Sequence, residues 1–254
     1  MMYLRPDLMP LSFDEVMSLK GNVYRELDNR RTQRVVLQGK AYFVKKHFGV
    51  GWVEIIKNLF QLRLPIISAK NEWRALQRLD ELGVLVPRIA GFGSRGINPA
   101  TMQSFMMTDE LPVHTTLEDI CKVWPTTGVS FLFKTKLIKE VARIARTLHE
   151  NGINHRDFYI CHFLLSHPMD ELKLYLIDLH RAQIRKKIPE RWLIKDLAAL
   201  YFSSKEIGLT KRDLLRFIRE YRNTTSLKIE LTQRTVFWQK VKHRGDKLYQ
   251  KHTR

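Results

Sequence analysis

The feature that most constrains this chain is a polar turn between a strong helix pattern and two apolar runs. Apolar residues recur at helical spacing across 134–150, which predicts a helix with one buried face. A glycine ends that pattern, and a polar stretch with His-Arg-Asp at 155–157 precedes the apolar run 163–165. A second apolar run, 174–177, leads directly to Asp178. Two aspartates therefore follow elements that are predicted to be buried, which indicates a site rather than an ordinary surface.

Composition sets the class of protein and the kind of partner. A chain of 254 residues with 44% hydrophobic content can bury a full core, as one large domain or as two lobes. Its net charge of +18 implies an anionic partner, whether nucleic acid, a membrane surface or a phosphorylated ligand. The two cysteines, Cys121 and Cys161, form no disulfide framework and suit a reducing compartment. We find no secretory signal and no apolar stretch near the roughly 20 residues of a membrane span. We therefore expect a soluble or surface-bound cytoplasmic protein.

Strand patterns come first along the chain and helix patterns follow, which predicts an α+β fold with two lobes. The first half predicts strands at 23–27, 34–38, 41–46, 88–93 and 103–108, with helices at 13–20 and 69–82. The second half predicts helices at 134–150, 191–202 and 211–221. We expect an N-terminal lobe with the nucleotide-binding sheet and helix over 1–110, a lobe with both aspartates over 111–232, and a basic tail over 233–254.

One further helix pattern has two interpretations. The basic connector at 52–64 carries Trp52, Ile55, Ile56, Leu59 and Phe60 at helical spacing. We expect this helix to pack on the N-terminal lobe, and contact with a membrane is the alternative.

The order of the charged residues fits phosphoryl transfer from a nucleotide, which needs a cation, metal-binding acids and a carboxylate. Lys45, in a predicted strand, could reach the phosphates, and Glu72, on the next clear helix, could pair with it. Asp157 would orient the acceptor hydroxyl and accept its proton, and Asp178 would bind Mg²⁺. Each residue alone has an ordinary surface interpretation; Lys46 follows Lys45, and one of the two must face outwards. Their joint order favours a kinase.

Three positions depart from the protein-kinase pattern. His162 stands where that pattern has a metal-binding asparagine, and imidazole is a less usual Mg²⁺ ligand than an amide oxygen. Leu179 and His180 follow the metal aspartate in place of Phe-Gly. No glycine-rich loop lies at 27–35; instead Arg30 and Arg31 occupy the predicted turn, where they could neutralise phosphates or form a solvated basic turn.

Longer strings resemble the lipopolysaccharide core heptose(I) kinase (RfaP/WaaP) family. They lie at 152–165, 177–183, 191–192, 195–197 and 200–204, and upstream at 23–31, 39–47, 54–58 and 72–73. The resemblance covers nearly the whole chain. It implies a protein-kinase-like two-lobed fold, with an N-terminal antiparallel sheet and helix and a larger, mainly helical C-terminal lobe. It also implies transfer of the γ-phosphate of ATP to the first heptose of the inner core, at the cytoplasmic face of the inner membrane.

The same resemblance assigns roles by position. Asp157 becomes the catalytic aspartate, Asp178 the metal aspartate, Lys45 the nucleotide lysine and Glu72 its partner. Asp196 is expected to hold the backbone of the catalytic loop.

The charge then has a candidate purpose, because the lipid A–core acceptor and the membrane leaflet around it are anionic. The best single candidate for a membrane contact is the basic tail at 234–254, with apolar residues at 236–238, 241 and 248. A solvated, partly frayed helix is the alternative.

Other functions stay open at this point. A kinase of the same fold could act on Kdo, a second heptose or a protein. A basic nucleic-acid-binding protein is disfavoured because no strand interleaves aromatic and basic residues. A zinc site is disfavoured too, because the clustered His and Cys residues lack CxxC or HxxxH pairing: His149, His155, Cys161, His162, His167 and His180.

Overall fold

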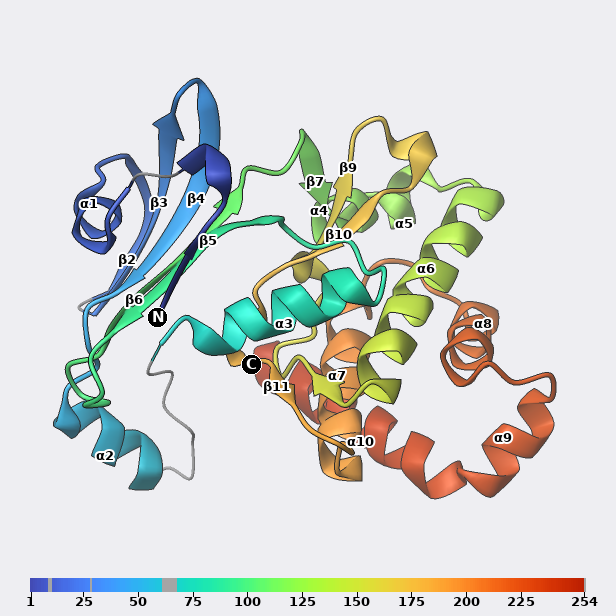
Figure 1. Cartoon of the computed structure of the whole chain (residues 1–254). Helices are drawn as coiled ribbons and strands as arrows, with labels where there is room; N and C mark the ends of the chain where they lie inside the picture. The colour runs from blue at the N-terminus through green and yellow to red at the C-terminus, as the bar shows by residue number, and fades with distance from the viewer. Residues whose placement is uncertain (9–10, 28, 61–67, 254) are drawn as a thin grey trace. The chain divides into compact units, whose positions relative to one another are not determined.

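The computed structural model describes residues 1–8, 11–27, 29–60 and 68–253. Two units account for the chain (Figure 1). The first contains Met1–Arg78, Pro87–Leu111 and Leu179–Arg181, and the second contains Leu79–Val86, Pro112–Asp178 and Ala182–Arg254.

An antiparallel sheet forms the centre of the first unit. Within the described residues it has six strands in the order β1-β5-β6-β4-β3-β2. Their bounds are β1 Met2–Leu4, β2 Asn22–Leu27, β3 Arg30–Leu37, β4 Lys40–His47, β5 Ile89–Arg95 and β6 Gln103–Asp109. The five predicted strands are confirmed, although β3 begins four residues earlier than expected. β1, in a stretch without a strand pattern, pairs with β5 from Met2 opposite Gly93 to Leu4 opposite Gly91.

Helices cover both faces of this sheet (Figure 1). On one face, α1 (Phe13–Ser18) buries Val16 in a core with Val35, Tyr42, Val44 and Phe105. It begins with a capping box formed by Ser12 and Glu15. On the other face lies α3 (Lys70–Glu81), whose Trp73 stacks on Phe92 of β5 with ring centroids 4.6 Å apart. A 3-10 turn, η1 (Pro6–Leu8), follows β1.

The connector helix α2 (Trp52–Phe60) is present but exposes most of its apolar face. Ile55 is buried, whereas Trp52, Ile56 and Phe60 are 56%, 48% and 82% exposed. The expected packing of these three side chains on the lobe is therefore wrong. The part of the predicted helix at 61–64 and the Leu59 side chain lie outside what the structure describes.

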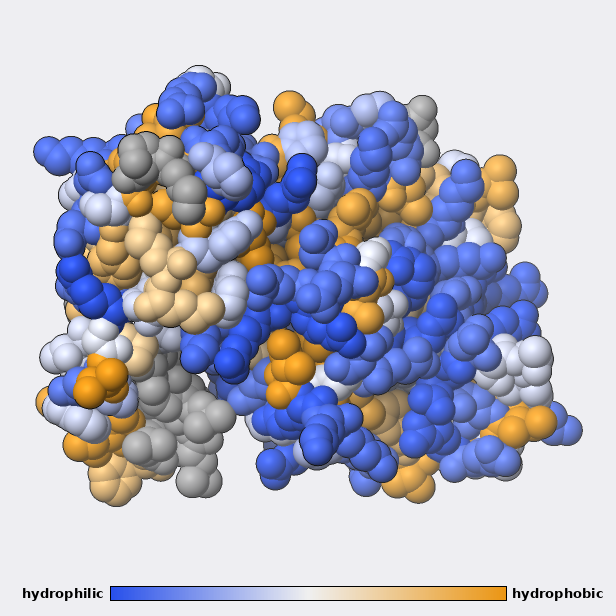
Figure 2. Space-filling view, in the orientation of Figure 1, coloured by the Kyte–Doolittle hydropathy of each residue, from blue (hydrophilic) through white to orange (hydrophobic). Residues whose placement is uncertain are grey.

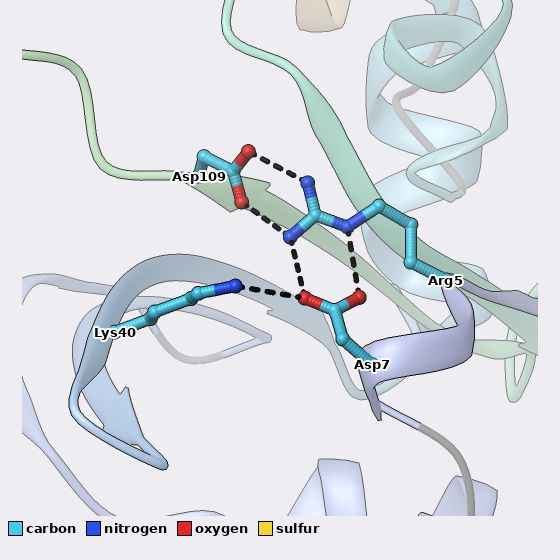
Figure 3. Close-up of polar contacts among 4 residues, drawn as sticks. All are labelled: Arg5, Asp7, Lys40 and Asp109. Carbon is cyan, nitrogen blue, oxygen red and sulfur yellow. Dashed lines mark hydrogen bonds and ion pairs between the residues drawn. The ribbon is translucent and has the colours of Figure 1, made fainter.

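A polar cluster fastens the N-terminal segment to the end of β6 (Figure 3). Both guanidinium Nη atoms of Arg5 donate to the Asp109 carboxylate at 2.7 Å, and the same guanidinium also pairs with Asp7. Lys40 Nζ lies 3.6 Å from Asp7. Because bidentate arginine–carboxylate pairs fix geometry, this cluster holds β1 at the sheet edge.

Removing the charge of Asp109 should loosen that attachment. Asp109→Asn is expected to lower the free energy of unfolding by about 1 kcal/mol, since the pair is only partly buried and is screened by solvent. Urea unfolding of the whole chain measures this change. Asp14→Asn is the matched control, because its pair with Arg95 is far more exposed, and it should change stability less. Equal changes in the two variants would contradict the assigned role of Arg5 and Asp109.

The second unit is mainly helical. Its helices are α4 Leu117–Lys122, α5 Trp124–Thr127, α6 Phe131–Glu150, α7 Glu190–Ser203, α8 Lys211–Arg222, α9 Leu227–Gln233 and α10 Thr235–His252. Short strands form a sheet β10-β9-β7 and a pair β11-β8: β7 His114–Thr116, β8 Ile153–Asn154, β9 Phe163–Ser166, β10 Leu174–Leu176 and β11 Gln183–Ile184. The predicted helices α6, α7 and α8 are confirmed, and α8 begins with a capping box formed by Thr210 and Asp213.

The basic tail is a packed helix rather than a frayed one. Phe237 and Val241 of α10 are buried, and a Cβ on Gly245 would lie 2.5 Å from the Tyr201 ring of α7. Phe237 and Val241, two of the apolar residues expected to contact the membrane, therefore pack inside the second unit. Among the described helices, none is both long and apolar enough to cross a membrane.

Candidate active site

The first unit places one lysine of β4 beside a buried glutamate. Successive strand residues point to opposite faces, so the side chains of Lys45 and Lys46 lie on opposite faces of the sheet. Lys45 Nζ lies 2.5 Å from Glu72 Oε1 of α3, and Glu72 is 4% exposed. Lys46 is buried on the α1 face, donates to the Leu19 carbonyl at 2.6 Å, and has its pKa lowered to about 8 by burial and by Arg31. The expected Lys45–Glu72 pairing is confirmed.

The two candidate arginines, Arg30 and Arg31, also lie on opposite faces of the sheet. Both lie in β3 rather than in the turn, which corrects the expectation from the sequence. Arg30 is opposite His47 and Arg31 is opposite Lys46, so only Arg30 shares the face of Lys45. Arg31 instead donates to Glu26 Oε1 at 2.9 Å.

His47, on the same face as Lys45, adds no positive charge there. It is buried, and burial together with the charges of Arg30, Lys45 and His180 lowers its pKa to about 3. The lysine and Arg30 therefore supply the cationic character of this face near β3 and β4.

In the second unit, a buried carboxylate holds the loop that carries Asp157. Asp196 of α7 is fully buried and accepts the backbone N–H groups of His155 at 2.7 Å and Arg156 at 2.8 Å. This is the contact expected of Asp196. Arg156 adopts a φ of 76°, a conformation that costs free energy for any residue other than glycine. The two charge-assisted hydrogen bonds offset that cost and fix the backbone immediately before Asp157.

Gly152 fixes the start of the same loop. Its φ is 76°, and a Cβ there would lie 1.8 Å from the Arg185 carbonyl oxygen. Arg185 N in turn donates to the Gly152 carbonyl at 2.9 Å, next to the β8–β11 pairing. Only glycine fits this close approach.

Two stacked histidines connect the Asp157 loop with the strand end before Asp178. The ring of His155 is fully buried, which lowers its pKa, and its Nε2–H donates to the Ile177 carbonyl at 3.0 Å. His162 Nδ1–H donates to the Asp157 carbonyl at 2.7 Å, because a carbonyl can only accept. Its Nε2 then lies 3.4 Å from Asp178 Oδ2. This tautomer leaves the Nε2 lone pair on the side of the Asp178 carboxylate.

The chemistry of these donors partly fits Mg²⁺. Asp178 supplies a carboxylate and has a φ of 62°, a strained conformation that sets its side chain direction. His162 supplies only a nitrogen, which suits Mn²⁺ better than Mg²⁺. Within the described residues, no three His, Cys, Asp or Glu side chains gather as a metal site. Mg²⁺ commonly takes one or two carboxylates and completes its shell with phosphates and water, so Asp178 fits that arrangement and His162 fits it less well.

A large apolar cavity in the second unit was not foreseen from the sequence. Its volume is about 570 Å³, and its walls come from α4, α6, α7, α8 and α10: among others Cys121, Val141, Leu200, Phe217 and Trp238. Helical periodicity marks these residues as inward-facing but does not distinguish a filled core from a cavity. The volume is in the range of small-ligand pockets.

Comparisons with known proteins agree with the resemblance seen in the sequence. The family model described as "Lipopolysaccharide kinase (Kdo/WaaP) family" matches residues 14–221. The chain is 51% identical over 214 residues to the lipopolysaccharide core heptose(I) kinase WaaP of Escherichia coli K12, covering 83% of this chain and 81% of that protein. It is 48% identical over 213 residues to the Pseudomonas aeruginosa protein of the same name, covering 82% and 80%.

A solved structure described as WaaP in complex with acyl carrier protein has a similar fold. Its TM-score is 0.80 at 41% identity, and the match covers 93% of this chain and 92% of that one. The match supports the α+β, protein-kinase-like fold expected from the sequence.

Proposed function

Because the chain belongs to the lipopolysaccharide kinase (Kdo/WaaP) family, we propose that it transfers the γ-phosphate of ATP to the first heptose of the lipopolysaccharide core. Relatives about half identical to it carry the name heptose(I) kinase. The observation that carries the proposal is the geometry of the Asp157 loop. Asp196 accepts two backbone N–H groups of this loop, and the His162 ring lies between the Asp157 carbonyl and the Asp178 carboxylate.

Asp157 has the position and chemistry to orient the acceptor. Its side chain is half-buried, and the backbone on either side is held by hydrogen bonds to Asp196 and His162. A carboxylate held in this way can accept the proton of a sugar hydroxyl as that oxygen attacks phosphorus. The loop therefore supplies positioning, which is the main requirement of phosphoryl transfer.

Lys45 is proposed to contact the phosphates of ATP, with Glu72 fixing its direction and Arg30 adding charge on the same face. Asp178 would hold Mg²⁺, which when bound offsets negative charge on the phosphates. His162, whose Nε2 lies 3.4 Å from Asp178 Oδ2, is a second, weaker candidate ligand. Arg31 is not part of this proposal, because it pairs with Glu26 on the opposite face of the sheet.

The acceptor sugar can be tested with purified components. ATP turnover is measured with the purified chain and two acceptors, one ending in Kdo and one carrying the first heptose. We expect phosphate transfer only to the heptosylated acceptor. Transfer to the acceptor that ends in Kdo would favour a Kdo kinase, and transfer to neither would refute the proposal.

Acyl carrier protein is proposed as a further partner. A solved relative at 41% identity is described as bound to it, and the cavity of about 570 Å³ in this chain has the apolar walls that an acyl chain requires. Val141→Phe is expected to fill part of the cavity and to reduce co-elution with acylated carrier protein on size-exclusion chromatography. Val236→Phe, at an exposed position of α10, is the control and should not. If both variants co-elute with acylated carrier protein as much as the wild type does, the assignment of the cavity is refuted.

We also propose that the protein works at the inner face of the inner membrane and that α2, rather than the tail, contacts the lipid. Val53 and Phe60 are 83% and 82% exposed, and Figure 2 shows hydrophobic residues over α2. Ile97 is fully exposed in the loop that meets the start of α2, where Gly51 N donates to the Ala100 carbonyl. An exposed apolar helix on a protein of charge +18 matches an anionic lipid surface.

Vesicle binding tests this contact. The double variant Ile56→Glu/Phe60→Glu is expected to bind vesicles of phosphatidylglycerol and phosphatidylethanolamine about tenfold more weakly, because it loses apolar insertion and gains repulsion. The matched control Ile229→Glu/Val236→Glu adds the same negative charge at exposed apolar positions of α9 and α10. A flotation assay in which both double variants lose binding equally would show that charge alone, not α2, mediates the contact.

A further inference from the structure

Positive side chains surround a tryptophan of α7 in the second unit. The charge centres of four residues lie 5.2–5.7 Å from the centre of the Trp192 indole ring: Arg156, Arg185, Arg191 and Lys195. Each distance falls within the range of a cation–π contact. The ring attracts each cation, but it carries no net charge and leaves their mutual repulsion in place. We call these five residues the Trp192 cluster.

Two members of the cluster have no acidic partner within the described residues. Arg185 donates to two neutral amide oxygens, Asn154 Oδ1 at 2.6 Å and Gln183 Oε1 at 2.5 Å. Arg191 is exposed, and its described contact is the Trp192 ring. The neighbouring acid, Glu190, instead lies 3.6 Å from Lys240. The positive charges of Arg185 and Arg191 are therefore not neutralised by carboxylates within the described residues.

Buried hydrogen-bond donors next to these arginines also lack acceptors. Asn154 is fully buried, and its Nδ2 has no hydrogen-bond partner among the described residues. The same holds for Nε1 of Trp192. Buried polar atoms are nearly always paired, so two orphaned donors beside a group of cations indicate a missing acceptor. A ligand with anionic oxygens would meet both requirements.

Phosphorylation of residues 179–195, which include every member of the cluster except Arg156, does not supply the anion. Residues 179–195 include no serine, threonine or tyrosine, so this segment cannot be phosphorylated on a hydroxyl. It runs from Asp178 to α7, and Arg185 also pairs through its backbone with Gly152 at the start of the catalytic loop. Arg156 directly precedes Asp157. A ligand of the cluster would therefore lie beside the residue proposed to orient the acceptor hydroxyl.

We propose that the Trp192 cluster binds an anionic group of the acceptor, a sugar carboxylate or a phosphate monoester, and so positions the acceptor for Asp157. This inference rests on the proposed function and adds the site that recognises the acceptor's charge. Arg185 and Arg191 supply the hydrogen bonds, and Trp192 supports their guanidinium groups.

The test compares Arg191→Gln with Arg212→Gln in steady-state kinetics of the full chain. Both arginines are exposed and lie in the second unit, so the two variants lose the same charge without disturbing a core. Arg191→Gln is expected to raise the acceptor KM about tenfold, the effect of losing one charge-assisted contact, with the KM for ATP unchanged. Arg212→Gln should leave both KM values as in the wild type.

Modified acceptors identify the anion. One acceptor has its carboxylates converted to methyl esters, and the other has its phosphates removed. The modification that removes the bound anion should raise the wild-type KM and abolish the difference between wild type and Arg191→Gln. If the wild type phosphorylates the acceptor but Arg191→Gln behaves like Arg212→Gln, the inference is overturned and the proposed function stands. If the wild type does not phosphorylate the acceptor, the proposed function fails and the inference fails with it.

Discussion

An Asp157→Asn variant is expected to fold as the wild type does and to transfer phosphate roughly a thousandfold more slowly, the range for loss of a general base. Asparagine preserves the size of the side chain but cannot accept the proton of the acceptor hydroxyl. The hydrogen bonds that hold the loop join its backbone atoms to the side chains of Asp196 and His162, so they survive the substitution. The KM values should change little, because the loss falls on the chemical step.

The measurement is kcat with ATP and a heptosylated acceptor, together with thermal unfolding of both proteins. Asp119→Asn is a suitable control, since Asp119 lies in the first turn of α4 in the same unit, where its carboxylate accepts from the hydroxyl of the capping residue Thr116, and it has no proposed part in transfer. Loss of activity together with a large fall in the unfolding temperature would assign Asp157 a structural role instead. An active Asp157→Asn enzyme would remove Asp157 from the mechanism.

An Asp178→Asn variant is expected to lose at least about a hundredfold in kcat at millimolar Mg²⁺, because the candidate metal site keeps no carboxylate. Asparagine is the appropriate replacement for this position: Asp178 has a φ of 62°, and asparagine adopts left-handed backbone conformations readily. Titrating the metal separates weak metal binding from misfolding, since excess Mg²⁺ should restore part of the rate only in the first case.

His162→Asn is the matched variant at the other candidate ligand. It exchanges a nitrogen donor for the amide oxygen that Mg²⁺ prefers. We expect it to retain activity with Mg²⁺ and to lose the advantage that an imidazole gives Mn²⁺, so the ratio of Mn²⁺ to Mg²⁺ rates should fall. An unchanged ratio would show that His162 does not bind the metal.

Local patterns were enough to predict most of the elements. The apolar spacing across 134–150 predicts α6, and Thr210 with Asp213 predicts the start of α8. β1 was missed because three residues carry no periodic signal and their partner strand, β5, lies far along the chain. The exposure of α2 could not be predicted either, since an apolar stripe looks the same whether it faces a core, a membrane or another protein.

The site shows the same division between local and long-range information. The order of Lys45, Glu72, Asp157 and Asp178 was readable, and so was the role of Asp196 in holding the loop. The sequence could not show whether Lys45 or Lys46 faces Glu72. That depends on which face of the sheet α3 covers and which face α1 covers. Likewise, the placement of Arg31 depended on where the β2–β3 hairpin turns.

The Trp192 cluster illustrates a limit of sequence reasoning. Its cations are scattered over Arg156, Arg185, Arg191 and Lys195, and each alone reads as a surface charge. Only the pairing of Gly152 with Arg185 and the contact of Asp196 with the loop bring the loop and α7 together. A usable sequence signal was the excess of basic residues between 185 and 195, with one acid, Glu190, among them.

The central claim concerns the sugar that receives the phosphate, and mass spectrometry of the reacted acceptor tests it most directly. The heptosylated core is incubated with ATP and the wild-type chain or Asp157→Asn, and the product is fragmented to locate the added phosphate. The account predicts one phosphate on the first heptose with the wild-type chain and none above background with Asp157→Asn. A phosphate on Kdo or on another sugar, or equal phosphorylation by the two proteins, would contradict it.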